Sequence, residues 1–254
     1  MKKTSLALIL ILFISCLFSY DNYQNTLTKA NSAYKNNDFD TALNLYSSLE
    51  NKIPKNPDLC YNIGNTYFRL NRIGLAILYY KKALLNNSSH FLAKKNLNFA
   101  IKFTIDKQDY ENQNFISNLI IKAYNYISLN ILADFLILAL LIFIFLLHKS
   151  IRKKSRHPQT LRLLLIISMF IVGGLVVWSS MRYYHYVNNN EAVILSPEVQ
   201  AYSGPGENYS NLFTIHEGLI IKINKKDNAW TLISLSNGLS GWVRSSTFNV
   251  VRND

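Results

Sequence analysis

The sequence is poor in the residues that build disulfide frameworks, tight turns and metal centres. Its 254 residues include only 2 cysteines, 5 prolines and 9 glycines. Cys16 and Cys60 are too few for a disulfide framework, and no His/Cys cluster has metal-ligand spacing. The scarcity of glycine and proline favours helix over most of the chain.

The sequence also lacks the signatures of an enzyme. It contains no GxSxG motif, no P-loop, no paired carboxylates and no Cys/His pair at a spacing that suits catalysis. We therefore expect a protein that is not an enzyme and that needs neither a cofactor nor a metal.

Acidic residues are scarce, and a net charge of +12 would suit a nucleic-acid-binding protein. Residues 20–126 carry 13 Lys/Arg against 8 Asp/Glu, and residues 182–254 carry six of each. Residues 148–162 carry six basic residues and no acidic one. Because no aromatic–basic binding module accompanies this charge, we expect no nucleic-acid partner.

The N-terminus has the pattern of a targeting segment. A basic start precedes a short apolar run, which is typical of a signal sequence over residues 1–19. Residues 14–16 resemble the end of a bacterial lipobox, in which Cys16 would be lipidated. Ordinary cleavage just after Ser19 or Tyr20, and retention as an uncleaved anchor, are the alternatives.

Two later apolar runs predict transmembrane helices at residues 127–147 and 163–181. The first run contains Asp134 near one end, which we interpret as an interfacial residue rather than a functional intramembrane carboxylate. The second run has no charged residue, and Gly173-Gly174 in its middle would allow close approach of another helix.

The loop between the two runs sets the expected topology. Residues 148–162 are strongly basic, and the positive-inside rule retains such a loop in the cytoplasm. The flanking parts of the chain then lie on the opposite side, which is the side that a signal sequence also predicts. We therefore expect a protein of the bacterial inner membrane with both soluble domains in the periplasm.

Residues 23–126 show internal repetition at about 34 residues. Residues 23–56 and 57–90 fit one register, and a third first helix begins at Phe91. The matching slots hold Ala30, Ala33, Tyr34, Asn37, Phe39, Ala42, Tyr46 and Pro54 in the first repeat, and Ile63, Gly64, Tyr67, Asn71, Ile73, Ala76, Tyr80 and Ala83 in the second. The pattern resembles the tetratricopeptide repeat, which implies a solenoid of paired helices with residues 110–126 as an amphipathic capping helix.

The resemblance implies a peptide groove lined by the first helix of each repeat. The candidate groove residues are Asn31, Tyr34, Lys35, Asn65, Phe68, Arg69, Lys95 and Lys102. Asn31, Asn65 and Lys95 match part of the carboxylate-clamp pattern of members that bind peptide tails. Leu27 and Phe99 stand where that pattern has cations. Cys60 occupies a slot that we expect to be a small core position.

From Glu191 onward, short β runs alternate with turn signals. The predicted strands are 192–195, 219–223, 230–235 and 240–243. Residues 225–228 would form one turn, and Asn237-Gly238 is typical of a two-residue hairpin. The lone histidines His185 and His216 are expected in solvent or in loops.

Three motifs in this part carry a second resemblance. Tyr202-Ser-Gly-Pro-Gly206, Leu212-Phe-Thr-Ile-His-Glu-Gly218 and Asn237-Gly-Leu-Ser-Gly-Trp-Val243 resemble a bacterial SH3-like domain, here over residues 190–252. The resemblance implies a small five-stranded barrel, and such domains often bind peptidoglycan. Tyr202, Trp230 and Trp242 are the candidate surface residues, with the tryptophans as core or partly buried platform residues.

The order of these parts predicts a multidomain membrane protein with an α-helical tetratricopeptide solenoid, two transmembrane helices and a small all-β SH3-like barrel. That order resembles the E-type protein of bacterial aerotolerance (Bat) operons. The resemblance implies an envelope complex with von Willebrand factor A-type membrane proteins. The leading hypothesis is a membrane-anchored scaffold or adaptor that holds protein partners on the periplasmic face. The alternative is a cell-wall module that binds peptidoglycan through the SH3-like domain.

Overall fold

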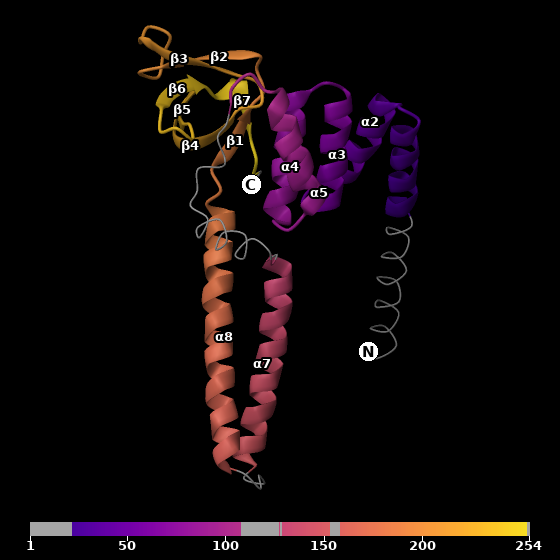
Figure 1. The fold of residues 1–254 in the computed structure, drawn as a ribbon, viewed down its shortest axis with the longest axis vertical. Helices are drawn as coiled ribbons and strands as arrows, with labels where there is room; N and C mark the ends of the chain where they lie inside the picture. Colours follow the sequence, from indigo (N-terminus) through magenta and orange to yellow (C-terminus); the bar gives the residue numbers. More distant parts are fainter. Residues whose placement is uncertain (1–21, 108–126, 128, 153–157, 253–254) are drawn as a thin grey trace, which may run out of the picture. The chain divides into compact units, whose positions relative to one another are not determined.

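The computed structural model describes residues 22–107, 127, 129–152 and 158–252 (Figure 1). The chain divides into two compact units. One unit contains the helices of the N-terminal part and the C-terminal sheet, and the other contains the long helices α7 and α8. The predicted signal sequence with Cys16, the capping helix at 110–126 and part of the basic loop lie outside the described residues.

The N-terminal part of the first unit, here called the helical region, consists of short helices. Residues 22–35 form the first described helix. It is followed by α2 (Phe39–Glu50), α3 (Pro57–Arg69), α4 (Ile73–Asn86), α5 (Phe91–Ala100) and the 3-10 helix η1 (Ile101–Phe103). Local sequence sets these bounds. Asp38 and Asn56 cap α2 and α3 by accepting backbone N–H groups of Thr41 and Leu59 at 3.2 and 2.9 Å.

The turns within the helix pairs repeat every 34 residues. Asn37 and Asn71 both have positive φ, at 61° and 59°, a left-handed conformation that asparagine tolerates better than most residues. The backbone hydrogen bonds that close the two turns recur at the same spacing. Each asparagine thus ends one helix so that the next one folds back on it.

The same period governs contacts between helices. The Tyr46 hydroxyl donates to Asn31 Oδ1 at 2.6 Å, and the Tyr80 hydroxyl donates to Asn65 Oδ1 at 2.8 Å. Gly64 lies against the Tyr80 ring, and a Cβ there would meet Cε1 of the ring at 2.7 Å. The second pair therefore packs closely because residue 64 has no side chain.

Cys60 lies in a small buried cluster with Ala83 and Ala93. Burial raises the pKa of the Cys60 thiol to about 12, so the thiol stays protonated and unreactive. The side chain therefore serves as a small core residue.

The C-terminal part of the first unit is one antiparallel sheet. Its strands are β1 (Glu191–Ile194), β2 (Glu198–Tyr202), β3 (Asn211–His216), β4 (Ile220–Asp227), β5 (Trp230–Ser234), β6 (Ser240–Arg244) and β7 (Phe248–Val250). The spatial order is β3-β2-β6-β5-β4-β1-β7. Inward-facing residues from alternate strand positions, among them Val199, Ala201, Ile233 and Val243, form its core.

The structure corrects the expected five-stranded barrel to a seven-stranded sheet. The strands β1, β4, β5 and β6 fall on the predicted runs. The strands β2, β3 and β7 were not predicted, because β2 and β3 alternate apolar with polar residues and β7 has only three residues.

Both predicted turns are also corrected. Strand β4 continues through Asp227, and the turn consists of Asn228, with a φ of 51°, and Ala229. At the other turn, Ser234 pairs with Ser240, so the loop around Gly238 is longer than a two-residue hairpin. Gly238 still adopts a left-handed conformation, with a φ of +88°.

The helical region and the sheet share an apolar core. Ala76 and Ile77 of α4 lie in one buried cluster with Val193 of β1, Ile220 of β4 and Val251 after β7. All are under one-tenth exposed. We call this cluster the joint, because residues far apart in the sequence complete one core there.

A side chain of the sheet caps a helix at the joint. Helix α4 begins at Ile73, and the preceding Arg72 offers no side-chain acceptor for the first N–H groups of the helix. Glu217 Oε1 accepts the backbone N–H of Gly74 at 2.8 Å, which supplies that acceptor. The Glu217 carboxylate also lies where the helix dipole favours negative charge.

Two further polar contacts join the helical region to the sheet. Lys81 Nζ of α4 lies 2.7 Å from Glu191 Oε2 of β1. Asp106 Oδ2 accepts the backbone N–H of His216 at 2.6 Å, and Asp106 Oδ1 lies 3.1 Å from His216 Nδ1. The expectation that His216 lies in solvent or a loop is therefore wrong: it ends β3, and Asp106 after η1 holds it.

The second unit contains two long helices, α7 (Leu129–Ile151) and α8 (Pro158–Val187), which pack side by side (Figure 1). Both are long and apolar enough to cross a membrane, and few of their described side chains are buried. Asp134 is exposed in the second turn of α7. A Cβ at Gly173 or Gly174 would meet nothing within 4 Å in the described part, so α7 does not make the expected close approach there.

Candidate functional site: two aromatic surfaces of the first unit

A pocket of about 200 Å³ opens on the helical region. Its lining comes from the first described helix, α3, α4 and α5, and consists of Tyr34, Asn65, Phe68, Arg69, Tyr80, Asn96 and Phe99. We call it the helical pocket. Because four helices supply its walls, the pocket exists only when the two repeats and α5 are stacked.

The floor of the helical pocket is polar. Asn65 Oδ1 accepts two hydrogen bonds, from the Tyr80 hydroxyl and from Asn96 Nδ2, both at 2.8 Å. Burial raises the pKa of Tyr80, so its phenol stays protonated and keeps donating. The two bonds use both lone pairs of the amide oxygen and fix the orientation of the amide. In the described part of the chain the Asn65 amide N–H₂ has no acceptor, so it can donate to a ligand oxygen.

Three phenylalanines form one wall of the pocket and extend it outward. The ring of Phe68 lies 5.6 Å from that of Phe99 and 5.5 Å from that of Phe103, and Phe99 lies 5.1 Å from Phe103. Phe99 and Phe103 remain 52% and 57% exposed. This aromatic trio thus presents a partly exposed apolar surface against which a ligand side chain can pack.

One basic side chain, Arg69, lines the helical pocket, and others lie close to its lining residues in the sequence. Arg69 Nη2 donates to Asn37 Oδ1 at 3.0 Å, and its guanidinium carbon lies 4.6 Å from the centre of the Phe39 ring. Three exposed lysines, Lys35, Lys95 and Lys102, have no ion-pair partner among the described residues. The surroundings therefore favour an anionic ligand.

The structure brings half of the predicted groove residues together. Tyr34, Asn65, Phe68 and Arg69 line the helical pocket, whereas Asn31, Lys35, Lys95 and Lys102 do not. Asn31 accepts its hydrogen bond from Tyr46, one repeat earlier. The site differs from that expected for a carboxylate clamp, because Phe99 stands where the clamp pattern has a cation.

Tyr80, Asn96 and Phe99 were missed as pocket residues. The sequence held one signal for Tyr80, since it follows Asn65 at the spacing that separates Tyr46 from Asn31. Phe99 falls one repeat after Asn65, so the register already placed it in the groove. No sequence signal marked Asn96, whose hydrogen bonds cross from α5 to α3.

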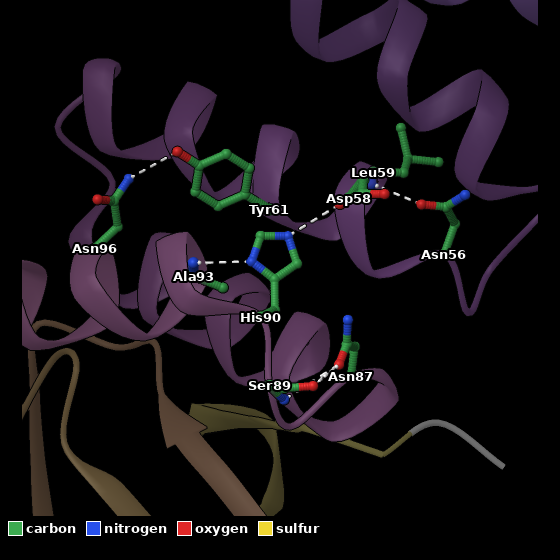
Figure 2. A network of polar contacts seen from close by, with 9 residues as sticks. All are labelled: Asn56, Asp58, Leu59, Tyr61, Asn87, Ser89, His90, Ala93 and Asn96. Atoms are coloured by element: carbon green, nitrogen blue, oxygen red, sulfur yellow. Dashed lines mark hydrogen bonds and ion pairs between the residues drawn. The ribbon is translucent and has the colours of Figure 1, made fainter. Parts of the chain in front are cut away.

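Figure 2 shows the contacts that hold α5 against α3. His90 Nδ1 accepts the backbone N–H of Ala93 at 3.1 Å and so caps α5, while His90 Nε2 lies 3.1 Å from Asp58 Oδ1. Because the cap needs an unprotonated Nδ1, the proton lies on Nε2 and faces the carboxylate. Nearby, Asn96 Nδ2 lies 3.4 Å from the Tyr61 hydroxyl. His90 thus fixes the position of the helix that carries Phe99.

The second candidate surface is the outer face of β2, β6 and β5, here called the sheet face. Tyr202, Trp230 and Trp242 all point outward there, since their neighbours along each strand face the core. The rings of Tyr202 and Trp230 meet edge to face at 5.5 Å, and the backbone of Tyr202 pairs with that of Trp242. The three candidates are therefore partly buried platform residues.

A cation that was not predicted completes the sheet face. Arg244 lies opposite Trp230 across β5 and β6, with its guanidinium carbon 5.2 Å from the centre of the indole ring. Glu207 Oε1 accepts from Arg244 Nη2 at 2.7 Å and from Nε at 3.1 Å. The outward alternation of β6 was the signal that would have found Arg244.

Nothing in the described residues suggests a metal centre, because no group of three His, Cys, Asp or Glu lies close enough to hold an ion.

Comparison with known proteins finds one family match, which lies within the sheet. Residues 196–248 match the model of the bacterial SH3 domain family, a range that runs from just before β2 to the start of β7. No curated protein matches the chain.

Proposed function

From the bacterial SH3 domain in the sheet, we propose that the chain is a membrane-anchored scaffold for protein partners at the bacterial envelope. The observation that carries this proposal is that the helical pocket and the sheet face belong to one compact unit, joined by a shared core. Two aromatic surfaces held at a fixed spacing suit the assembly of partners. In this proposal the chain is a binding protein without catalytic chemistry.

The helical region supports a tetratricopeptide identity within the proposal. Its turns, its left-handed asparagines and its Tyr–Asn hydrogen bonds all recur at 34 residues. Stacks of this kind present a groove along their first helices, and the helical pocket lies among those helices.

The membrane anchor of the proposal is the helix pair of the second unit. The exposed surface of α7 and α8 is built from large apolar residues, such as Phe145 and Phe170, which suits contact with lipid. The basic residues 148–162 between the helices favour a cytoplasmic loop, which would put both surfaces of the first unit in the periplasm of the inner membrane. The order of the parts supports a Bat-type envelope complex with von Willebrand factor A-type membrane proteins.

A second candidate function is peptidoglycan binding through the SH3 domain. The sheet face favours it, since Tyr202, Trp230 and Trp242 form a platform on which a sugar ring can stack, and Arg244 with Glu207 supplies polar groups at its edge. This candidate uses one surface of the first unit, whereas the scaffold uses two.

One experiment separates these functions. The full chain is crosslinked in native membranes, solubilised and purified, and a Trp242→Ala variant is treated in parallel. The full chain is also sedimented with purified cell wall. The scaffold predicts recovery of specific membrane proteins, which the variant loses in part. The wall-binding function would replace the scaffold if three results were obtained together. The full chain would sediment with cell wall, the Trp242→Ala variant would not, and crosslinking would recover no protein partner.

A further inference from the structure

The two long helices of the second unit meet along one regular seam. In α7 the buried and half-buried residues recur at alternating intervals of four and three, and every other described side chain from residue 131 to 151 is exposed. The seam of α8 follows the same alternation from Leu161 to Tyr186. These intervals are typical of a coiled-coil pair. The seam of α7 consists of Leu132, Leu136, Ala139, Phe143, Leu146 and Ser150.

The opposite side of α7 carries an acidic residue, Asp134. Each residue of an α-helix turns by about 100°, so Asp134 lies roughly 160° from the seam and points away from α8. It is exposed and makes no polar contact with the described residues. The same side holds Ile137, Leu141 and Phe145, which are 57%, 60% and 65% exposed. We call these four residues the outer face of α7.

In the proposed anchor, Asp134 lies deeper than the edge of the apolar region. Arg182 of α8 ends the charge-free run 163–181, and its Nη2 donates to the backbone oxygen of Ile127 at 3.3 Å. The edge that Arg182 marks is therefore level with the residues just before α7, which begins at Leu129. Five residues later, at about 1.5 Å per residue, Asp134 lies roughly 7–8 Å further along the helix.

The length of α7 leads to the same position for Asp134. The charge-free run 135–147 measures only about 20 Å, whereas the hydrocarbon core of a bilayer is about 30 Å thick. At the other end of the run, Lys149 can extend its long side chain to the membrane surface, but the short side chain of Asp134 cannot. In the anchor, Asp134 is thus an intramembrane carboxylate, rather than the interfacial residue expected from the sequence.

We propose that the outer face of α7 docks a transmembrane helix of a partner membrane protein that places a Lys or Arg side chain opposite Asp134. The inference rests on the proposed membrane-anchored scaffold. A lone carboxylate exposed to lipid is costly, and ionisable residues inside a membrane are normally paired. A basic side chain complements the charge of Asp134. Apolar side chains of the same partner helix pack against Ile137, Leu141 and Phe145, which removes lipid from around the ion pair.

Charge complementarity favours a different protein over a second copy of this chain. A second copy docked on the same face would bring its own Asp134 close, and two like charges repel. The runs 135–147 and 163–181 contain no Lys or Arg that could lie opposite Asp134. Arg182, at the edge of the second run, already donates to Ser88 Oγ at 2.7 Å and to the backbone oxygen of Ile127.

The test reconstitutes the full chain, with a donor dye at its C-terminus, in phosphatidylcholine vesicles and measures energy transfer to a labelled model helix. The probe is a helix of about 22 Leu and Ala residues with one Lys about five residues from one end. The comparison probes carry Leu or Asp in place of that Lys, or carry the Lys at the centre. We expect saturable transfer to the first probe and about tenfold weaker association of the other three.

Variants of α7 locate the site. Asp134→Leu should abolish the preference for the Lys probe, and Asp134→Glu should keep it, because only the second variant retains the charge. Leu141→Ala and Leu140→Ala are a matched pair, since they make the same change at adjacent residues that are 60% and 38% exposed. Only Leu141 lies on the outer face, so only Leu141→Ala should weaken binding, by about threefold to tenfold.

Alkaline extraction confirms that each variant remains in the membrane. Asp134→Leu makes α7 more apolar, so it should insert at least as well as the original chain. Equal transfer to the Lys and Leu probes would overturn the inference. Unchanged preference in Asp134→Leu, or equal effects of Leu141→Ala and Leu140→Ala, would do the same. Transfer between two labelled copies of the chain that Asp134→Leu abolishes would also overturn it.

Crosslinking in native membranes separates this inference from the scaffold. The original chain should recover a partner with a basic residue inside a transmembrane helix, and Asp134→Leu should recover less of it. If both chains recover the same partners in the same amounts, the scaffold stands and only the docking on α7 falls. If the original chain recovers no partner at all, the scaffold falls and the docking falls with it.

Discussion

The helical pocket rests on side-chain contacts between helices, whereas the sheet face rests on backbone pairing between strands. In the pocket, Tyr80, Asn65 and Asn96 come from α4, α3 and α5 and hold one another by hydrogen bonds. On the sheet face, Trp242 points outward because its strand neighbours Gly241 and Val243 are buried. The pocket therefore depends on each of its polar side chains, while the outward aromatics of the sheet can change without loss of the strand register.

The two regions differ again in how each is completed. The sheet has its own core of inward-facing residues. Helix α4, in contrast, receives its N-terminal cap from Glu217 and part of its apolar cover from Val193, Ile220 and Val251. Residues of the sheet therefore cover the helical region at α4, much as a capping repeat covers the end of a repeat stack.

The largest expected effect comes from opening the joint. Ile77 is fully buried between the helical region and the sheet, so Ile77→Ala should lower the free energy of unfolding by about 2–5 kcal/mol. Denaturation of the full chain in detergent, in a Trp178→Phe background, is followed by far-ultraviolet circular dichroism for the helices and by the fluorescence of Trp230 and Trp242 for the sheet. Both signals should shift together. A shift of the helical signal alone would contradict a shared core.

Ile63→Ala is the matched comparison, because Ile63 is equally buried in a cluster whose buried residues come from the first described helix, α2 and α3. It removes the same atoms from a cluster that contains no residue of the sheet. If Ile77 couples the two regions, the unfolding transition seen by tryptophan fluorescence should shift more in Ile77→Ala than in Ile63→Ala.

A smaller effect is expected from the cap at the joint. Glu217→Ala leaves the N–H of the buried Gly74 without its acceptor, which should cost about 1–3 kcal/mol. Glu217→Gln keeps an acceptor but loses the charge, so about half of the stability should return. Hydrogen exchange of the first turn of α4 measures both variants. Equal protection in Glu217→Ala and the original chain would show that the cap contributes nothing.

The repeat predicts a matched pair of losses. Tyr80→Phe and Tyr46→Phe remove hydroxyls that donate to Asn65 and Asn31 at equivalent positions, so each should cost about 1 kcal/mol. Chemical denaturation measures both. Tyr80→Phe should also weaken binding in the helical pocket, and Tyr46→Phe should not, since only Tyr80 lines it. Equal effects of the two variants on binding would show that the ligand does not bind in the helical pocket.

The smallest expected effect lies at the start of α5. His90→Ala removes the cap on Ala93 and should cost about 1 kcal/mol or less, whereas His90→Asn supplies another good capping side chain and should restore stability. Thermal unfolding of the full chain distinguishes the two. If His90→Asn were as unstable as His90→Ala, the contact with Asp58 rather than the cap would be the stabilising one.

Local patterns in the sequence predicted much of the fold. The helix boundary at Phe91 followed from the 34-residue register, and the four apolar β runs followed from their composition. The strands β2 and β3 escaped prediction because their outward positions hold Glu198, Gln200 and Thr214, which leave only a weak alternating signal.

The contacts between distant residues could not be predicted. Glu217 and Gly74 lie 143 positions apart, and nothing in either local sequence identifies the other. His216 was expected in solvent or in a loop for the same reason, because its partner Asp106 is 110 positions away. The pocket residues Tyr34, Asn65 and Phe68 were found because the repeat register turns a distant contact into a periodic one.

The scaffold is tested most directly by one quantitative comparison in native membranes. The full chain, its Phe99→Ala variant and its Trp242→Ala variant are crosslinked in parallel, and the recovered membrane proteins are quantified. The account predicts that the full chain recovers a defined set of partners and that each variant, though folded and inserted, loses part of it. Identical recovery by all three chains, or no partner for any of them, would contradict it.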